Sequence, residues 1–163
     1  MGDPKKTRKK FTPPAHPWQK ARIEQEKAIM TTYGLKNKRE IWKLVSKLKG
    51  FSMQAKNLIA STSEQGKKEK EQLLSKLSSL NMLPENADLD SVLSLKPEDI
   101  IERRLQTLVC RKKLASSMKQ ARQYIVHGHV FVGDRKITVP SYLVRKEEEA
   151  AIRVVDVLQP EEK

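Results

Sequence analysis

The sequence predicts an α+β protein, with an N-terminal helical region followed by a small fold of two helices, a β-hairpin and a closing strand. Before residue 128, apolar residues recur three and four positions apart, as on one face of a helix. After it, short apolar segments alternate with Gly and Pro, as in strands joined by turns. We expect a basic extended arm at 1–17, a helical domain at 18–96, a small basic domain at 97–158 and an acidic tail at 159–163.

The arm and the first helix are separated by prolines. Pro13, Pro14 and Pro17 exclude regular helix from the arm, which also carries a run of like charges. A helical pattern begins after Pro17 with Trp18, and Gly34 is placed to end it.

A second helix is expected to begin at Asn37, with Glu40 three residues later as its capping partner. Its apolar stripe is followed by Gly50, which is expected to end it. Ser52 is then placed to cap a third helical segment.

Gly66 interrupts the helical period, which resumes in a stripe of leucines and stops at Asn81. Pro97 and the acids after it are typical of a helix start, and one helix is expected from there. Its apolar positions are Ile101, Leu105 and Leu108, and the opposite side carries Arg103, Arg104 and Arg111.

A further helix is expected from Met118 to His127. Ser117 and Gln120 have the spacing of a capping box, and Gly128 is a suitable stop. The inward side carries Met118, Ala121 and Ile125, and the outward side carries Lys119, Arg122, Gln123 and Val126.

A hairpin follows this helix. Its strands are 130–132 and 135–139, joined by Gly133-Asp134, with glycine at the first position as in a type II′ turn. Pro140 ends the second strand, a short strand is expected at 142–144, and the last strand is expected at 151–155.

The distribution of charge indicates an anion-binding surface. The chain has a formal net charge of +13, and residues 103–146 hold eleven basic side chains against Asp134 alone. Nucleic acid is the commonest partner for such a surplus. The RNA-binding residues predicted in the small domain are Arg103, Arg104, Arg111, Lys112, Lys113, Ser116, Ser117, Lys119, Arg122, Gln123, His127, His129, Arg135 and Lys136. Those predicted in the N-terminal region are Lys5, Lys6, Arg8, Lys9, Lys10, His16, Lys20 and Arg22.

Several other functions are disfavoured. Cys110 is the only cysteine, so neither an internal disulfide nor a zinc site built on cysteines can form. His127 and His129 form a tempting metal pair, but a third ligand is not near in sequence, and we expect no metal and no cofactor. There is no phosphate-binding glycine loop or catalytic triad spacing, so we expect neither an enzyme nor a small-molecule substrate. Apolar runs are too short for a membrane span, and from the residues at the N-terminus we expect no secretory signal.

The motifs of this chain resemble a known family. The segments 121–123, 127–132 and 139–142 resemble the small RNA-binding fold named after protein four of the small ribosomal subunit, and the segments 9–11, 16–24 and 33–38 resemble its archaeal and eukaryotic form. Two departures are Gln106, where relatives often have Asp, and Gly133-Asp134 in place of the usual Asn-Gly turn.

The resemblance implies a cytoplasmic structural constituent of the small ribosomal subunit. It implies binding to small-subunit ribosomal RNA early in assembly, and contact with neighbouring ribosomal proteins. It further implies a place near the messenger RNA entry path and an influence on translational accuracy.

Two alternatives stay open from the residues. The same small fold is also appended to RNA-modifying enzymes and some tRNA synthetases, and finding an intact catalytic partner in a complex would support that alternative. A basic helical protein that binds membranes or chromatin is the second, and preference for anionic vesicles over structured RNA would support it.

Overall fold

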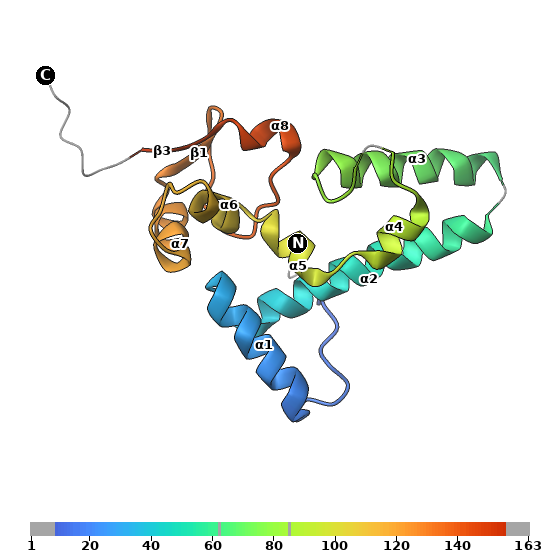
Figure 1. Ribbon diagram of the computed structural model, residues 1–163, viewed down its shortest axis with the longest axis horizontal. Coiled ribbons are helices and arrows are strands. Elements are labelled where there is room, and N and C mark those ends of the chain that lie inside the picture. Colours follow the sequence, from blue (N-terminus) through green and yellow to red (C-terminus); the bar gives the residue numbers. More distant parts are fainter. Residues whose placement is uncertain (1–8, 62, 85, 156–163) are drawn as a thin grey trace, which may run out of the picture.

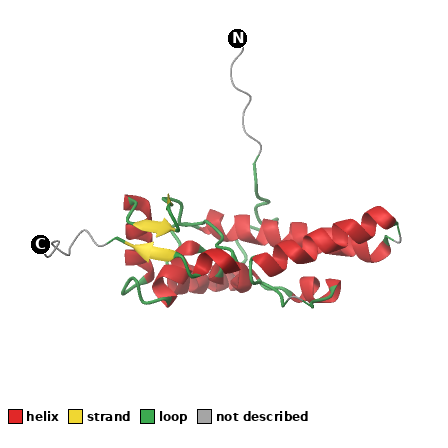
Figure 2. Ribbon diagram, turned by 90° about the horizontal axis from the view of Figure 1, so that it is seen from above, coloured by secondary structure: helices red, strands yellow, loops and turns green. Residues whose placement is uncertain are grey.

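The computed structural model describes residues 9–61, 63–84 and 86–155, which form an elongated molecule with a helical hairpin at one end and a small sheet at the other (Figures 1 and 2). The helices are α1 (Lys20–Tyr33), α2 (Lys38–Ala60), α3 (Glu64–Ser79), α4 (Leu89–Ser94), α5 (Pro97–Glu102), α6 (Leu105–Arg111), α7 (Met118–His127) and α8 (Lys146–Glu149). The strands are β1 (Val130–Val132), β2 (Arg135–Lys136) and β3 (Ile152–Val154). The predicted α+β class is confirmed.

Helix α2 is longer than the sequence pattern predicted. It continues through Gly50 to Ala60, so the expected stop at Gly50 is wrong. The helix continues because Phe51 and Ala55 extend its buried stripe against α3 and α4, which outweighs the weak helix propensity of a single glycine. Ser52 does not cap a new segment, since its hydroxyl donates to the Leu48 carbonyl inside the same helix at 3.1 Å.

The boundaries of α3 follow ordinary capping chemistry. The Ser63 hydroxyl accepts a hydrogen bond from the Gly66 N–H at 3.1 Å, so Gly66 lies in the first turn of α3 and the predicted interruption is wrong. Asn81 has a φ of 52° directly after the helix, and the predicted stop there is confirmed. A left-handed asparagine is a common residue just beyond a helix end.

The buried apolar side chains form three clusters along the molecule. One joins α2, α3 and α4 through residues such as Phe51, Leu77 and Val92. A second joins α2 to α5 through Leu44, Leu48, Ile100 and Ile101. The third fills the space between α6, α7 and the sheet, and its buried members are Leu105, Leu108, Val109, Ala115, Ala121, Ile125, Val130, Val132, Val144 and Ile152.

The single helix predicted from Pro97 is in fact two, α5 and α6. Between them Arg104 is extended and forms an isolated antiparallel bridge with Leu143. The bridge is closed by Leu105 N–H donating to the Tyr142 carbonyl at 2.8 Å, and by Val144 N–H donating to the Arg103 carbonyl at 3.0 Å. The expected strand at 142–144 is therefore this bridge. These backbone bonds compensate for the helical ones lost at the break.

The sheet has the order β2-β1-β3, and both pairs are antiparallel. Phe131 lies opposite Lys136 in one pair and opposite Arg153 in the other. The predicted hairpin is present, with Gly133 at a φ of 60°, although the second strand is only two residues long. Val130 and Val132 point inward, and α7 covers that face.

The run of acids after β2 forms α8, which the sequence pattern did not predict. The Tyr142 hydroxyl donates to the Glu148 carboxylate, with oxygen distances of 2.9 and 3.0 Å. Burial, the hydrogen bond with Glu148 and that residue's charge raise the pKa of Tyr142. The Glu148 carboxylate also accepts the Arg145 N–H at 3.0 Å, and it is thus committed to contacts within the protein.

Candidate nucleic-acid interface

Helix α7 carries the predicted binding residues on a well-capped scaffold. Ser117 caps it by accepting from the Gln120 N–H at 3.2 Å, as predicted. The other half of the predicted capping box is wrong, because the side-chain Oε1 of Gln120 accepts from the N–H and hydroxyl of Ser116 instead. At the other end Gly128 has a φ of 80°, and it ends the helix as predicted.

Several predicted cations extend outward from the loop before α7, from α7 itself and from the hairpin. These outward cations are Lys112, Lys113, Lys119, Arg135 and Lys136, and all are exposed. Lys112 also donates to the Glu149 carbonyl, and the stem of Lys136 packs over Gly128 at the carboxyl end of α7. Their spread over both ends of α7 suits contact with an extended polyanion better than with a single small ion.

Arg103 and Arg104 do not face outward as expected from an unbroken helix. Only 8% of Arg103 and 2% of Arg104 is exposed. The break between α5 and α6 turns both side chains inward, where Arg103 donates to Glu149 at 2.8 Å and Arg104 donates to Glu40 at 2.7 Å. Their predicted place on the outer surface is corrected, and their charges are already paired inside the protein.

Arg111 and Arg122 are also paired. Arg111 donates to Glu102 at the surface, and Arg122 donates to both oxygens of Glu40, at 2.8 and 3.4 Å. Arg122 lies on the outward side of α7 as predicted, but it is only 25% exposed. Gln123, the next residue, is exposed.

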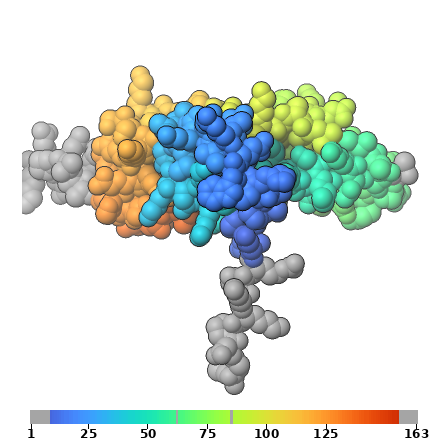
Figure 3. Space-filling view, turned by 90° about the horizontal axis from the view of Figure 1, so that it is seen from below, coloured from blue at the N-terminus to red at the C-terminus, as the bar shows by residue number. Residues whose placement is uncertain are grey.

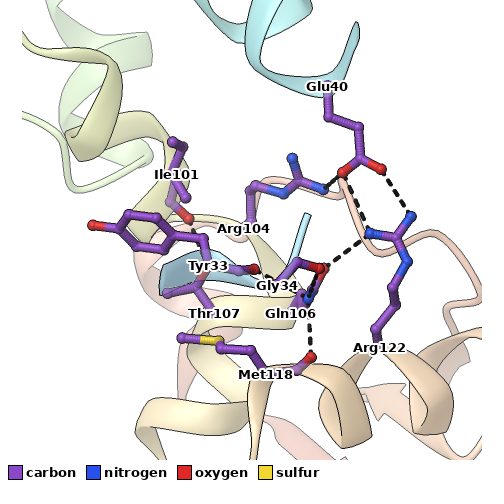
Figure 4. Close-up of polar contacts among 9 residues, drawn as sticks. All are labelled: Tyr33, Gly34, Glu40, Ile101, Arg104, Gln106, Thr107, Met118 and Arg122. Atoms are coloured by element: carbon purple, nitrogen blue, oxygen red, sulfur yellow. Dashed lines mark hydrogen bonds and ion pairs between the residues drawn. The ribbon is translucent and has the colours of Figure 1, made fainter. Parts of the chain in front are cut away.

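Glu40 therefore joins α2 to two arginines that come from α7 and from the break before α6 (Figure 4). Glu40 does not cap α2 as predicted. Asn37 occupies the N-cap position of that helix, but its side chain makes no capping hydrogen bond. Burial acts to raise the pKa of Glu40, but the hydrogen bonds from Arg122 and Arg104 and their charges outweigh it, so the pKa is lowered. The carboxylate is thus held ionised between two cations.

Gln106 binds the same junction from the other side (Figure 4). Its side-chain nitrogen donates to the carbonyls of Met118, Gly34 and Tyr33 at 3.0, 3.2 and 3.3 Å, and only 1% of the residue is exposed. It therefore connects the end of α1, helix α6 and the start of α7. An aspartate here could not donate to these carbonyls, so this contact depends on the amide.

A groove of about 480 Å³ opens where α2 meets α7 and the segment before α8. Three cations, Arg39, Lys43 and Lys47, line it along α2, with Arg104 and Arg122 across from them. Burial, and to a smaller extent the charge of Lys76 on α3, lower the pKa of Lys47. Like charges one turn apart destabilise a helix by repulsion, and a bound anion relieves this repulsion.

Sequence reasoning missed these three α2 cations. Their spacing of four residues was a usable signal, since it places them on one side of α2, next to the buried stripe. What could not be read from the sequence is that this side faces α7, because that contact joins segments about eighty residues apart.

The predicted N-terminal residues differ in exposure. Lys9, Lys10, His16 and Lys20 are exposed, whereas Arg22 is partly buried. Arg22 donates to the carbonyls of His16 and Pro17 at 2.6 and 2.9 Å, which fixes the chain before α1. The predicted residues Lys5, Lys6 and Arg8, and the acidic tail at 159–163, lie outside the described residues.

The N-terminal arm contacts α2 at residues 11 and 12. The Phe11 ring lies 6.0 Å from the Trp42 ring, and the Thr12 N–H donates to the Ser46 hydroxyl at 3.0 Å. Trp42 in turn donates to the buried carboxylate of Glu26 at 2.9 Å. Figure 3 shows α1, in blue, near the middle of the elongated molecule.

His127 and His129 follow one another around the end of α7. Their ring centroids are 6.3 Å apart and nearly stacked, and the His129 ring meets Tyr124 edge-on. No group of three His, Cys, Asp or Glu side chains is placed to hold a metal ion within residues 9–61, 63–84 and 86–155. None of the helices in that part of the chain combines the length and the apolar character needed to cross a membrane.

Two helices packed on a small antiparallel sheet, with cations on the exposed side, are typical of a small RNA-binding domain. Residues 103–149 match the S4 domain, an RNA-binding α+β fold. Chains called small ribosomal subunit protein uS4 are similar over nearly the whole length. Those from Picrophilus torridus and Methanococcus aeolicus are 52% and 54% identical, and each alignment covers 93% of this chain and 85% or 86% of the relative. The one from Ignicoccus hospitalis is 48% identical over 93% of this chain and 92% of its own length.

The chain therefore belongs to the family of small ribosomal subunit protein uS4. The resemblance in its sequence motifs to the archaeal form of that family is confirmed.

Proposed function

We propose that this chain is a structural, non-enzymatic constituent of the small ribosomal subunit that binds its ribosomal RNA. Family membership over nearly the whole chain carries the proposal. The outward cations support it physically, because they present charge over an extended surface rather than around one pocket. Such a surface can bind the phosphates of a folded RNA.

The residues that carry RNA contact in this proposal differ in role. Lys112, Lys113, Lys119, Arg135 and Lys136 contact phosphates from the S4 domain, and Ser116 and Ser117 lie beside them at the start of α7. The groove cations Arg39, Lys43 and Lys47 extend the contact onto α2. Exposed Lys9, Lys10, His16 and Lys20 add to it from the N-terminal side.

Finer expectations belong to the same proposal. An extended cationic surface that spans two parts of the chain suits a protein that brings RNA segments together during assembly. The proposal also includes neighbouring small-subunit proteins as partners, a cytoplasmic ribosome as location, a position near the messenger RNA path and an influence on decoding accuracy. These follow from the family resemblance.

The test is binding of the full chain to small-subunit ribosomal RNA and to an unrelated structured RNA of equal length, over a series of salt concentrations. The variant is Lys113→Gln with Lys119→Gln, and glutamine retains most of the side-chain length. The matched control is Lys67→Gln with Lys70→Gln, which removes the same charge from exposed positions of α3.

The proposal expects tighter binding to the ribosomal RNA, and a loss confined to the first pair. Each lost phosphate contact lowers the slope of log K against log salt by about 0.9. Equal affinity for both RNAs, or equal effects of the two double variants, would mean that the chain acts only as a general polycation. Tighter binding to anionic vesicles than to either RNA would instead support the membrane alternative.

A further inference from the structure

The groove beside α2 contains an acid in an unexpected place. Glu40 is the one acidic side chain among the described residues that line it, and the others that carry charge are all cations. If the groove takes a phosphate backbone, a carboxylate there opposes binding by simple electrostatics. The position therefore calls for a physical reason.

The contacts of Glu40 supply that reason. Both of its oxygens are occupied, one by Arg104 at 2.7 Å and the other by Arg122 at 2.8 Å. Arg104 precedes α6, Arg122 lies on α7, and Glu40 lies on α2, so a single carboxylate joins the helical region to the S4 domain (Figure 4). The Arg122 contact uses both oxygens, which fixes orientation as well as distance.

We infer that Glu40 is a positioning residue for RNA binding. It holds the row formed by Arg39, Lys43 and Lys47 at a fixed distance and angle from the outward cations of the S4 domain. An RNA backbone then meets both sets of cations at once without first having to order the two parts. Pre-organisation of this kind raises affinity because the ordering cost is met during folding rather than during binding. The inference rests on the proposed function.

This role makes a prediction opposite to that of charge alone. Removing a negative charge from a cationic groove should strengthen binding of a polyanion. Removing a positioning carboxylate should weaken it, since α2 and α7 can then move apart and fewer phosphates are contacted together. The sign of one affinity change thus separates the two explanations.

The junction retains other contacts when Glu40 is changed. Gln106 still joins α1, α6 and α7, and the buried cluster between α2 and α5 is untouched. Glu40→Gln is therefore expected to keep the fold. Glu40→Asp is the second variant: it keeps the negative charge but is one methylene shorter, and it is expected to recover part of the binding.

The experiment compares Glu40→Gln with Glu71→Gln, which removes an equal charge from an exposed position of α3. Affinity for small-subunit ribosomal RNA is measured over a salt series, after circular dichroism shows that each variant is folded. In parallel, nitroxide labels on cysteines placed at Lys68 and Asp134, in a Cys110→Ala background, report the distance between the two ends of the molecule without RNA.

We expect Glu40→Gln to bind about tenfold more weakly. The slope of log K against log salt should become shallower by the equivalent of about one phosphate contact, and the distribution of distances between the labels should broaden. Glu71→Gln is expected to bind as the unchanged protein or slightly more tightly, with unchanged distances. Binding by Glu40→Gln that is equal to or tighter than that of Glu71→Gln would overturn the inference. If the unchanged chain does not prefer ribosomal RNA, the proposed function fails, while the label distances still test whether Glu40 fixes the junction.

Discussion

Gln106 offers the most direct test of how the two parts of this molecule are joined. It is almost fully buried, and its side-chain nitrogen donates to three backbone carbonyls from two other elements. The junction is tightly packed there, since a Cβ on Gly34 would come within 2.9 Å of the Met118 Cβ. Water therefore has little room to replace a lost donor.

The expected cost can be worked out from these contacts. Gln106→Met keeps the length and approximate volume of the side chain but removes both amide hydrogens. Two hydrogen bonds of about 1 kcal/mol each are lost, and a carbonyl left without a partner costs about 1–3 kcal/mol. We expect Gln106→Met to lower the free energy of unfolding by about 3–5 kcal/mol. Gln106→Ala should cost about 1 kcal/mol more, because it also leaves a cavity.

Urea unfolding of the full chain, followed by circular dichroism, measures these changes. The matched control is Gln123→Met, which makes the same replacement at an exposed position of α7 and is expected to change stability by less than about 0.5 kcal/mol. If Gln106→Met costs no more than Gln123→Met, the amide does not join α1, α6 and α7, and the reasoning from these hydrogen bonds is wrong.

Two further predictions concern acid stability and the end of α7. The folded-state pKa of Glu40 lies below its ordinary value of 4.5, so its contribution to stability is complete above that pH and is lost as the pH falls through the folded pKa. The stability difference between the unchanged chain and Glu40→Gln should therefore shrink below pH 4.5 in urea titrations, and a difference independent of pH would contradict this. Gly128→Ala places a Cβ at a φ of 80° and against the Lys136 stem, and we expect a loss of about 1–2 kcal/mol from the backbone strain alone. Adding Lys136→Ala should relieve only the contact, and full recovery in thermal unfolding would show that the strain is negligible.

Local signals were read correctly where the neighbouring residues decide the structure. Gly34 and Gly128 end their helices because a left-handed residue is needed there and glycine adopts it without strain. Gly133 forms the hairpin turn for the same reason. Ser117 caps α7 because its hydroxyl can reach an N–H only three residues away.

The same local signals failed where a distant segment competed with them. Gly50 lies in the middle of α2. The burial of Phe51 and Ala55, which follow it, outweighs the weak helix propensity of glycine. Glu40 leaves its expected capping role for two arginines far along the chain. Hydrogen bonds from two guanidinium groups in a partly buried site are stronger than one bond from a backbone N–H at the surface.

The sequence by itself determined the α+β class, the basic surplus, the hairpin and the family motifs, because each of these depends on residue type and short-range spacing. The tertiary structure alone decided which cations are available. Arg103 and Arg104 face inward because a bridge to Leu143 breaks the helix that would have exposed them. Arg39 faces a groove because α2 packs beside α7. Charge is a property of the residue, whereas its exposure and its partners depend on contacts between segments that are far apart in the chain.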